Sequence, residues 1–182
     1  MNETQQMLED SVNRLFGDRL DWDALTRIEE LGFPAELWHE VTDQGIHKVL
    51  ADEDRGGMGV GWSDAYPVLR ACGRHAVPLP VVETAIVEWL ARQADCALPE
   101  GVPGLLPGTL DAAVLSGDGL SLRETRVPWG GVASYLAGVT AVGGGAELVI
   151  AAGEGLDVAP ELNIGRDPRD RLSGTARIVA RH

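Results

Sequence analysis

The stretch ADEDRGGMGVGWSDAYPVLRACGRHAVPLPVVET, residues 51–84, decides the fold class of the first half of the chain. Its glycine-rich start is too flexible for a helix and predicts a turn-rich connection. Ser63 is predicted to cap a helix that ends at Gly73. The two prolines that follow require extended backbone, and a second helix is predicted from there to about Ala94. The stretch therefore predicts two helices separated by irregular chain.

Upstream of this stretch, apolar residues recur at helical spacing in three short segments. The first predicted helix ends at Gly17, and the second covers Trp22–Leu31. Pro34 stands where a helix accepts proline, at its first position, and opens a third helix that Gly45 closes. The sequence up to residue 100 thus predicts an all-helical domain.

Downstream, residues 95–109 are rich in proline and glycine and predict a linker. Beyond Leu110, short apolar runs alternate with turn residues, which is typical of an all-β domain. The triple glycine Gly143–Gly145 predicts a hairpin loop between two strands. The predicted strands are Ala112–Leu115, Leu120–Arg126, Ser134–Val142, Leu148–Ala152 and Ala176–Ala180.

Charge is divided unevenly along the chain. Residues 1–100 carry 19 acidic residues against 8 Lys and Arg, a net charge of -11, whereas residues 101–182 carry 9 against 7, a net charge of -2. This shift supports a boundary near residue 100. The predicted fold class is α+β, with a helical domain at residues 1–100 and a small antiparallel, barrel-like β domain at residues 101–182.

Composition excludes several classes of function. A net charge of -13 disfavours nucleic-acid binding, which needs a basic surface. No apolar run approaches the roughly 20 residues that span a bilayer, and the polar, acidic N-terminus lacks the features of a signal peptide. Cys72 and Cys96 do not have the spacing of a metal site and are expected to remain thiols. The sequence predicts a cytoplasmic protein without a metal.

Familiar catalytic motifs are missing. VGGGAE, residues 142–147, differs from G-x-G-x-x-G and precedes a strand where a dinucleotide site needs a helix. His39, His47 and His75 have no Cys or carboxylate cluster at ligand spacing, so surface or capping roles are predicted. The serines lack the G-x-S-x-G context of a hydrolase. None of these patterns predicts an active site.

The segment RDPRDRL allows two interpretations. Arg166, Arg169 and Arg171 have the guanidinium geometry that binds phosphates. Asp167 and Asp170 are interleaved with them and can pair with the same arginines. The favoured interpretation is a solvated loop with local ion pairs, and phosphate binding is the alternative.

From Leu37 to Leu90 the order of segments resembles the N-terminal domain of acyl-CoA dehydrogenases. A helix with LWHEVTDQGI precedes ADEDRGGMGVG, a helix with the exit ACGRHA follows, and PLPVVET opens another. The glycines match the family's GG-x-G connection at Gly56, Gly57, Gly59 and Gly61. RETRVPWGGVASYLAG, residues 123–138, is similar to the middle β domain, particularly in the small subunits of bacterial heteromeric acyl-CoA dehydrogenases.

The resemblance also has gaps. GVPGLLPGTLDAAVL, residues 101–115, has none of the family's flavin-contacting Thr-Glu-Pro and Gly-Ser-Asp pattern. Val127, Pro128 and Trp129 stand where the family has Trp-Ile-Ser or Trp-Ile-Thr, and proline offers neither a hydroxyl nor an N–H. The family's C-terminal helical bundle, with its glutamate base, has no counterpart. No catalytic residue is therefore assigned, and the lone chain is not expected to be active.

What the resemblance implies is a subunit or fragment that contributes to FAD-dependent α,β-dehydrogenation of an acyl-CoA thioester, in fatty acid or steroid side-chain catabolism. The alternative is a catalytically inactive scaffold or regulatory module. The matching family helix lines the acyl pocket, so the candidate substrate-binding residues are Glu83, Thr84, Ile86 and Val87. The alternative interpretation of these residues is ordinary helix packing. Val127 and Trp129 are the candidate cofactor-binding positions.

FAD is expected in the assembled complex and not in the isolated chain. The expected partners are a full-length acyl-CoA dehydrogenase-type chain, or a second copy of this one, together with an acyl-CoA substrate. Trp129 and Tyr135 are the predicted anchors of a contact through the β half or the inter-domain groove, because aromatic residues are enriched in interface cores.

Overall fold

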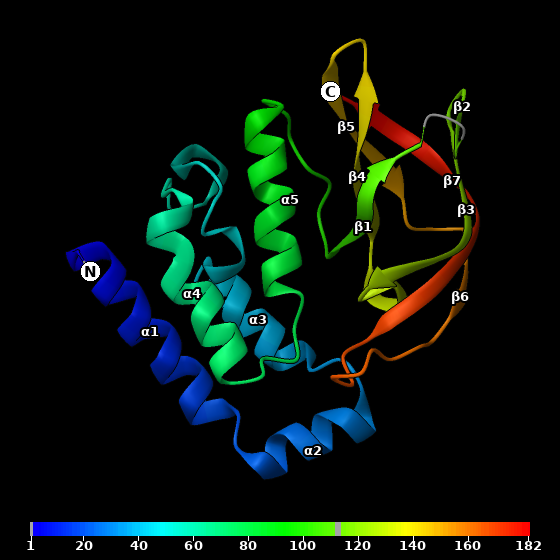
Figure 1. Ribbon diagram of the computed structural model, residues 1–182. Coiled ribbons are helices and arrows are strands. Elements are labelled where there is room, and N and C mark those ends of the chain that lie inside the picture. The colour runs from blue at the N-terminus through cyan, green and yellow to red at the C-terminus, as the bar shows by residue number, and fades with distance from the viewer. Residues whose placement is uncertain (1, 112–113) are drawn as a thin grey trace. The chain divides into compact units, whose positions relative to one another are not determined.

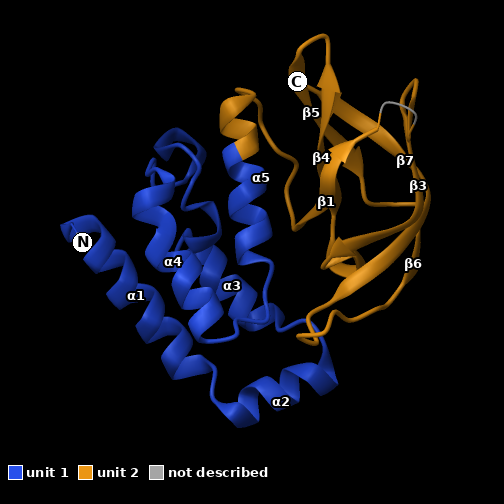
Figure 2. Ribbon diagram, viewed as in Figure 1, with its two compact units in different colours: residues 1–89 blue, residues 90–182 orange. Residues whose placement is uncertain are grey.

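The computed structural model describes residues 2–111 and 114–182. The chain divides into two compact units, Met1–Trp89 and Leu90–His182 (Figures 1 and 2). Helices make up the first unit, and strands dominate the second. The units divide inside the last long helix, and the domain boundary at residue 100 stays a prediction.

The first two helices have the termini that their sequences dictate. α1 (Glu3–Arg19) begins with a capping box, in which the Asn2 side chain accepts the N–H of Gln5 and the Gln5 side chain accepts the N–H of Asn2. α1 continues past Gly17, where the sequence predicted its end. α2 (Trp22–Leu31) covers the predicted residues, capped by the side chain of Asp21.

The remaining helices surround the glycine-rich connection. They are α3 (Ala35–Asp43), the short 3-10 turns η1 (Ile46–Lys48) and η2 (Glu53–Arg55), α4 (Trp62–Arg74) and α5 (Val81–Gln93). The predicted cap at Ser63 is wrong, because α4 begins one residue earlier with Gly61 at its N-cap. Gly73 lies inside α4 and does not end it.

The core of the helical unit is made by apolar side chains of all five helices and of the 3-10 turn η1. Its fully buried side chains include Phe16, Val41 and Leu50. Gly57 fits this fold only as glycine, because a Cβ there would lie 2.2 Å from the backbone oxygen of Ala51. The glycine-rich motif is therefore a place where two backbone segments touch.

The second unit is a curled mixed sheet. The strands are β1 (Pro103–Leu110), β2 (Leu115–Ser116), β3 (Gly119–Pro128), β4 (Tyr135–Val142), β5 (Gly145–Ala152), β6 (Asp157–Ala159) and β7 (Arg169–Arg181). Among the described residues their order is β1-β4-β5-β7-β3-β2, with β6 also paired to β7. The long β7 joins both halves of the sheet, because it pairs with β5 near its end and with β3 along its length (Figure 1).

The α+β fold class is confirmed, and two details of the β domain are corrected. One strand pair, β1 with β4, is parallel, whereas all the others described are antiparallel. The predicted linker at residues 95–109 contains most of β1, and β6 was not predicted. The predicted strand at Ala112–Leu115 begins with two residues that lie outside the described ranges. The hairpin prediction is confirmed, with Val142 opposite Gly145.

The sheet closes over its own apolar core, whose buried members are Leu106, Leu120, Leu122, Val127, Leu136, Ala151, Leu172 and Ala176. Most are on β3, β4 and β7. No helix in the described ranges is both long enough and apolar enough to cross a membrane.

Candidate functional site

The four predicted substrate-binding residues occupy the first two turns of α5. Thr84 is buried, and its hydroxyl donates a hydrogen bond of 2.7 Å to the carbonyl of Pro80, one turn earlier. Val87 is fully buried, whereas Glu83 and Ile86 are half-buried. At about 100° per residue, the four side chains spread over nearly half of the helix circumference. Around the helix they follow the order Ile86, Glu83, Val87, Thr84 at steps of about 40–60°, and the substrate-binding role stays a prediction.

Sequence reasoning missed the most unusual side chain of α5, the buried carboxylate of Glu88. Its side chain is only 9% exposed, and its Oε1 lies 3.7 Å from the ammonium nitrogen of Lys48. Burial raises the pKa of Glu88 above its ordinary value, because the charged form loses its hydration; the cations Lys48 and Arg55 partly oppose this effect. The available signal was a lone acid inside the apolar run IVEWL, and the only lysine of the chain.

Lys48 also forms a hydrogen bond with the 3-10 turn η2, which precedes the glycine-rich motif. Its Nζ donates a hydrogen bond of 3.4 Å to the carbonyl of Arg55 at the end of η2. Next to it, burial and the charge of Lys48 lower the pKa of His47 to about 4, so that imidazole is neutral at pH 7. The His47 ring stands edge-on to Trp38 at 5.7 Å. The Glu88–Lys48 pair thus ties α5 to the connection through partly desolvated charges.

The predicted cofactor positions lie at the turn from β3 to β4. Val127 is fully buried and belongs to the core of the sheet. Trp129 is also buried and has left-handed backbone, with φ of 57°, and it opens the short turn η4 (Gly130–Val132). Both side chains are inward, and their cofactor role stays a prediction.

Five backbone N–H groups of this turn, those of Trp129 and of residues 131–134, are engaged within the chain. The N–H of Trp129 donates to the carbonyl of Pro168 at 3.1 Å, and that of Val132 donates to Trp129 at 3.1 Å. The N–H of Gly131 donates to the buried carboxylate of Asp170 at 2.7 Å. The amides of the next two residues likewise donate to backbone carbonyls. Asp170 therefore fixes the turn in one conformation.

This turn does not fit the flavin-gripping role that the family resemblance implies. Pro128 has no N–H, and the amides of Trp129, Gly131 and Val132 are held by the chain's own acceptors. A hydrogen bond to FAD from one of these three amides would first have to break a contact within the chain. These positions therefore give no flavin hydrogen bond without rearrangement.

Of the three arginines of RDPRDRL, Arg171 has two ion pairs. It pairs with Glu124 at 2.7 Å and with Glu161 at 2.9 Å, and Arg126 on β3 also pairs with Glu161 at 2.8 Å. The segment from Arg169 onward belongs to β7 and the partners lie on other segments, so the predicted solvated loop with local ion pairs is wrong for these residues. The two pairs leave Arg171 unavailable for phosphate.

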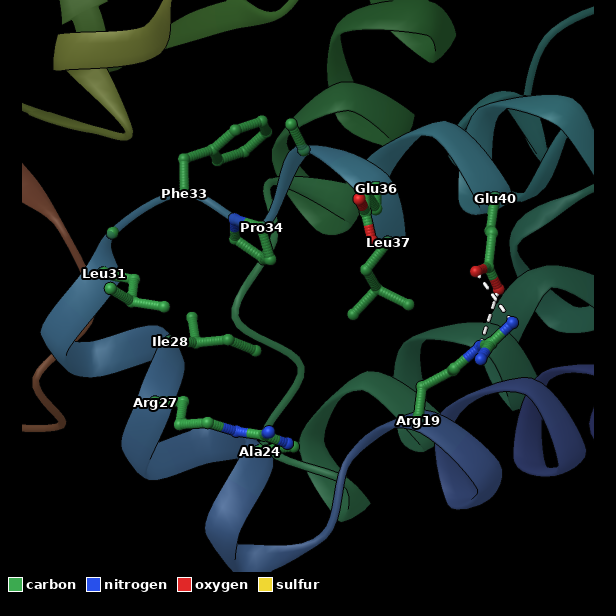
Figure 3. Close-up of a pocket in the computed structure, with 12 residues that line it drawn as sticks. Arg19, Ala24, Arg27, Ile28, Leu31, Phe33, Pro34, Glu36, Leu37 and Glu40 are labelled. Atoms are coloured by element: carbon green, nitrogen blue, oxygen red, sulfur yellow. Dashed lines mark hydrogen bonds and ion pairs between the residues drawn. The ribbon is translucent and has the colours of Figure 1, made fainter.

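A hollow of about 450 Å³ lies between α2 and α3 (Figure 3). Its walls are mainly apolar, with Ile28 and Leu37 pointing inward, and the ion pair of Arg19 with Glu40 at 2.9 Å stands at one side. The volume is within the range of ligand pockets. None of the predicted site residues lines it.

The predicted interface anchors are wrong in this structure. Trp129 and Tyr135 are both buried, so neither presents an aromatic surface to a partner. The large exposed apolar side chains of the second unit are instead Val142, Val158, Leu162, Ile164 and Val179. Aromatic character alone did not reveal which residues the sheet would cover.

Comparison with solved structures shows which proteins share this fold. The chain is similar to the ChsE4-ChsE5 complex from Mycobacterium tuberculosis, with a TM-score of 0.73 and 19% identity over 98% of this chain and 56% of that one. It is similar to a variant of the Tcur3481-Tcur3483 steroid ACAD, with a TM-score of 0.69 and 21% identity over 97% of this chain and 56% of that one. It is also similar to an acyl-CoA dehydrogenase from Geobacillus kaustophilus, with a TM-score of 0.65 and 13% identity over 98% of this chain and 57% of that one. All three share the fold of a helical unit followed by a β unit.

The sequence itself identifies the family. The family model of the acyl-CoA dehydrogenase N-terminal domain matches residues 2–95, which are 94 of the 182 residues. The chain therefore belongs to the acyl-CoA dehydrogenase family. It spans little more than half of the length of the solved chains it matches. No curated protein sequence matches it.

Proposed function

We propose that this chain is a subunit of a heteromeric acyl-CoA dehydrogenase, in which a partner chain supplies the flavin contacts and the catalytic base. The assembled enzyme would carry out FAD-dependent α,β-dehydrogenation of an acyl-CoA thioester in the cytoplasm. The two free, buried thiols suit such a reducing compartment.

The observation that carries this proposal is the combination of a family fold with a β3–β4 turn whose amides are largely engaged. The fold of both units matches solved structures over 98% of the chain. The turn amides at Trp129, Gly131 and Val132 are nevertheless bound internally. A chain with this fold and few available donors at the turn fits a subunit whose partner holds the cofactor.

Within such an assembly, α5 is the element proposed to meet the acyl group. Thr84 and Val87 are buried, and the Thr84 hydroxyl already donates to its own helix. Ile86 and Glu83 are half-buried, so of the four residues they are the ones that a ligand can reach. The apolar side chain of Ile86 suits contact with an acyl chain better than with a polar substrate.

A second candidate function is a scaffold or regulatory module without catalysis. The bound amides of the β3–β4 turn favour it as well, because they donate to acceptors within the chain, that of Gly131 to Asp170 and those of Trp129 and Val132 to backbone carbonyls. The two functions differ in whether a flavin-bearing complex exists and turns over.

The test compares the lone chain with a complex purified through a tag on this chain from its native host. We expect the lone chain to be colourless and to show no acyl-CoA oxidation with an artificial electron acceptor. The complex is expected to contain a second dehydrogenase-type chain, to show the flavin absorbance bands and to oxidise an acyl-CoA. A flavin-loaded, active lone chain would refute the subunit proposal, and a flavin-free complex without turnover would favour the scaffold.

A further inference from the structure

The hollow between α2 and α3 has an apolar floor, made by Ile28, Leu31, Phe33, Pro34 and Leu37 (Figure 3). An amphipathic helix normally buries its apolar face. None of the ten residues of α2 is fully buried, however, and Leu31 at its end is 85% exposed. The described part of the chain thus leaves the face of α2 that borders the hollow only partly covered.

The α3 side of the hollow is acidic. Glu36 and Glu40 line it one turn apart, and Asp43 follows on the same face of α3, at about 100° per residue. Arg19 pairs with Glu40 at 2.9 Å, and Asp43 lies 3.5 Å from Nδ1 of His39, whose ring is charged only if protonated. Glu36 is exposed and has no bonding partner among residues 2–111 and 114–182. With His39 neutral, three carboxylates against one arginine give this side a net charge of -2.

The α2 side carries the other cation that lines the hollow, Arg27. Asp23 stands four residues before Arg27 and Glu30 three residues after it, so the three side chains share one side of α2. All three are exposed, and none has a bonding partner within the described ranges. This side therefore has a net charge of -1, and the apolar floor lies between two acidic borders.

The charges and the walls together indicate what fits the hollow. An anionic ligand would meet Arg27 and also the carboxylates on both borders. A second copy of this chain would bring a helical half with a net charge of -11 against acidic borders. A helix with an apolar face and basic flanks complements both the floor and the borders. It also bonds its own backbone groups, so it needs no backbone partners from the walls.

We propose that the hollow between α2 and α3 is a docking groove for a basic amphipathic helix of a partner protein. Its apolar face packs on Ile28, Leu31 and Leu37, and its Lys or Arg side chains pair with Glu36 and Asp43 on one border and with Asp23 and Glu30 on the other. The inference goes beyond the proposed function and does not depend on it, because none of the predicted substrate or cofactor residues lines the groove.

The test selects binders for the whole chain from a displayed library of helical peptides. The peptides are about 15 residues long, the length at which an isolated helix begins to form. Leucines at positions i, i+3, i+4 and i+7 make one apolar face, and the flanking positions vary among Lys, Ser and Glu. We expect the selected peptides to carry Lys at the flanks and to bind with dissociation constants of about 1–100 μM.

Leu31→Asp tests the floor of the groove, and Trp22→Asp is the matched control. Both residues are exposed and belong to α2, but nine residues at about 100° each place them on opposite faces. We expect Leu31→Asp to raise the dissociation constant of a selected peptide at least about tenfold and Trp22→Asp to change it less than about twofold. Since both side chains are exposed, the unfolding midpoint of each variant should stay close to that of wild type.

Glu36→Lys tests the borders of the groove. It should weaken the same peptide about twofold to fivefold at low salt and less at high salt, because exposed charge pairs are screened. The control is Glu154→Lys, which makes the same change in net charge at an exposed residue that does not line the groove. A smaller effect of Glu154→Lys separates a local pairing from general attraction to an acidic protein.

Each contrary outcome overturns the proposal. A library that yields no binder, or binders with Glu at the flanks, would show that the groove does not accept a basic helix. A selected peptide that binds Leu31→Asp as tightly as wild type occupies another surface. If Leu31→Asp abolishes self-association of the chain and leaves peptide binding unchanged, the groove takes a second copy.

Discussion

Replacing Lys48 with methionine should destabilise the helical unit through the buried carboxylate of Glu88. Methionine keeps most of the apolar stem of lysine and removes only the ammonium group, which lies 3.7 Å from Glu88 Oε1. The variant leaves Glu88 buried with Arg55 as its remaining cationic neighbour. The expected cost is therefore electrostatic.

The magnitude follows from the exposure of the pair. Breaking a fully buried ion pair costs roughly 3–5 kcal/mol. The Lys48 side chain is 35% exposed, so solvent screens part of its charge, and Arg55 still compensates some of the charge of Glu88. We therefore expect Lys48→Met to lower the free energy of unfolding at pH 7 by about 1–2 kcal/mol. Replacing both partners, as Lys48→Met with Glu88→Met, should cost less than the single change.

The sign of the pH dependence can be worked out. The folded-state pKa of Glu88 is raised, so the folded protein binds the proton more tightly than the unfolded chain. Its contribution to stability is fully present below the unfolded pKa and is lost as pH rises through the folded pKa. Lys48→Met raises the folded pKa further, so its cost should shrink as pH falls. His47, with its pKa lowered to about 4, acts in the opposite direction in both proteins.

The assay is urea unfolding followed by tryptophan fluorescence, with the pH series repeated in the Glu88→Gln background. In that background the cost of Lys48→Met should be small at pH 7, and any pH dependence that remains comes from His47, whose pKa Lys48 also lowers. The difference between the two backgrounds therefore isolates Glu88. A coupling energy near zero in this double-mutant cycle would refute the argument, because it would mean that the two groups do not interact.

Three more predictions concern backbone contacts and thiols. Gly57→Ala should destabilise the protein by several kcal/mol or prevent folding, since its Cβ would overlap a backbone oxygen; Gly73→Ala, in open space within α4, should stabilise it by about 0.5–1 kcal/mol in the same urea assay. Asp170→Ala should cost about 1–3 kcal/mol, because the N–H of Gly131 loses its acceptor; an Asp170→Ala variant as stable as wild type would show that the turn does not depend on this carboxylate. Burial raises the pKa of Cys72 to about 12, so a disulfide reagent at pH 8 should label it only after unfolding, and rapid labelling of the native protein would contradict its burial.

Sequence periodicity predicted the helices well because each buries one stripe of a short amphipathic segment. α2 matched at both ends, since Asp21 caps it and Gly32 follows it. The error at α4 arose because a serine is usually the better cap, yet the glycine before Trp62 takes the extended conformation that a cap requires.

The prediction of a linker at residues 95–109 was wrong because most of β1 lies there and pairs with β4. β1 contains two prolines and two glycines, a composition that argues against a strand. Its register with β4 shifts between Leu105 and Thr109, so Pro107 and Gly108 fall in an interruption of the ladder. Only the partner strand, distant in sequence, makes this segment extended.

The candidate sites were predicted from the order of segments along the chain. The structure adds the burial of each side chain and its contacts with distant residues, which the order of segments does not give. Periodicity placed Thr84 and Val87 on a helix, but their burial depends on what the rest of the chain packs around them. Glu88 and Asp170 were missed because a single acidic letter does not reveal burial. Their partners are 40 and 39 residues away, at Lys48 and Gly131 respectively.

β1 has one more consequence, for the way this protein avoids aggregation. It ends the strand order of the described sheet, so one side of its backbone has no neighbouring strand. Unpaired strand edges are templates for intermolecular pairing. Pro103 and Pro107 remove two of the N–H donors that such pairing would use, and the register shift interrupts the row. The same residues that hide the strand from sequence reasoning should also protect its edge from fibril-like growth.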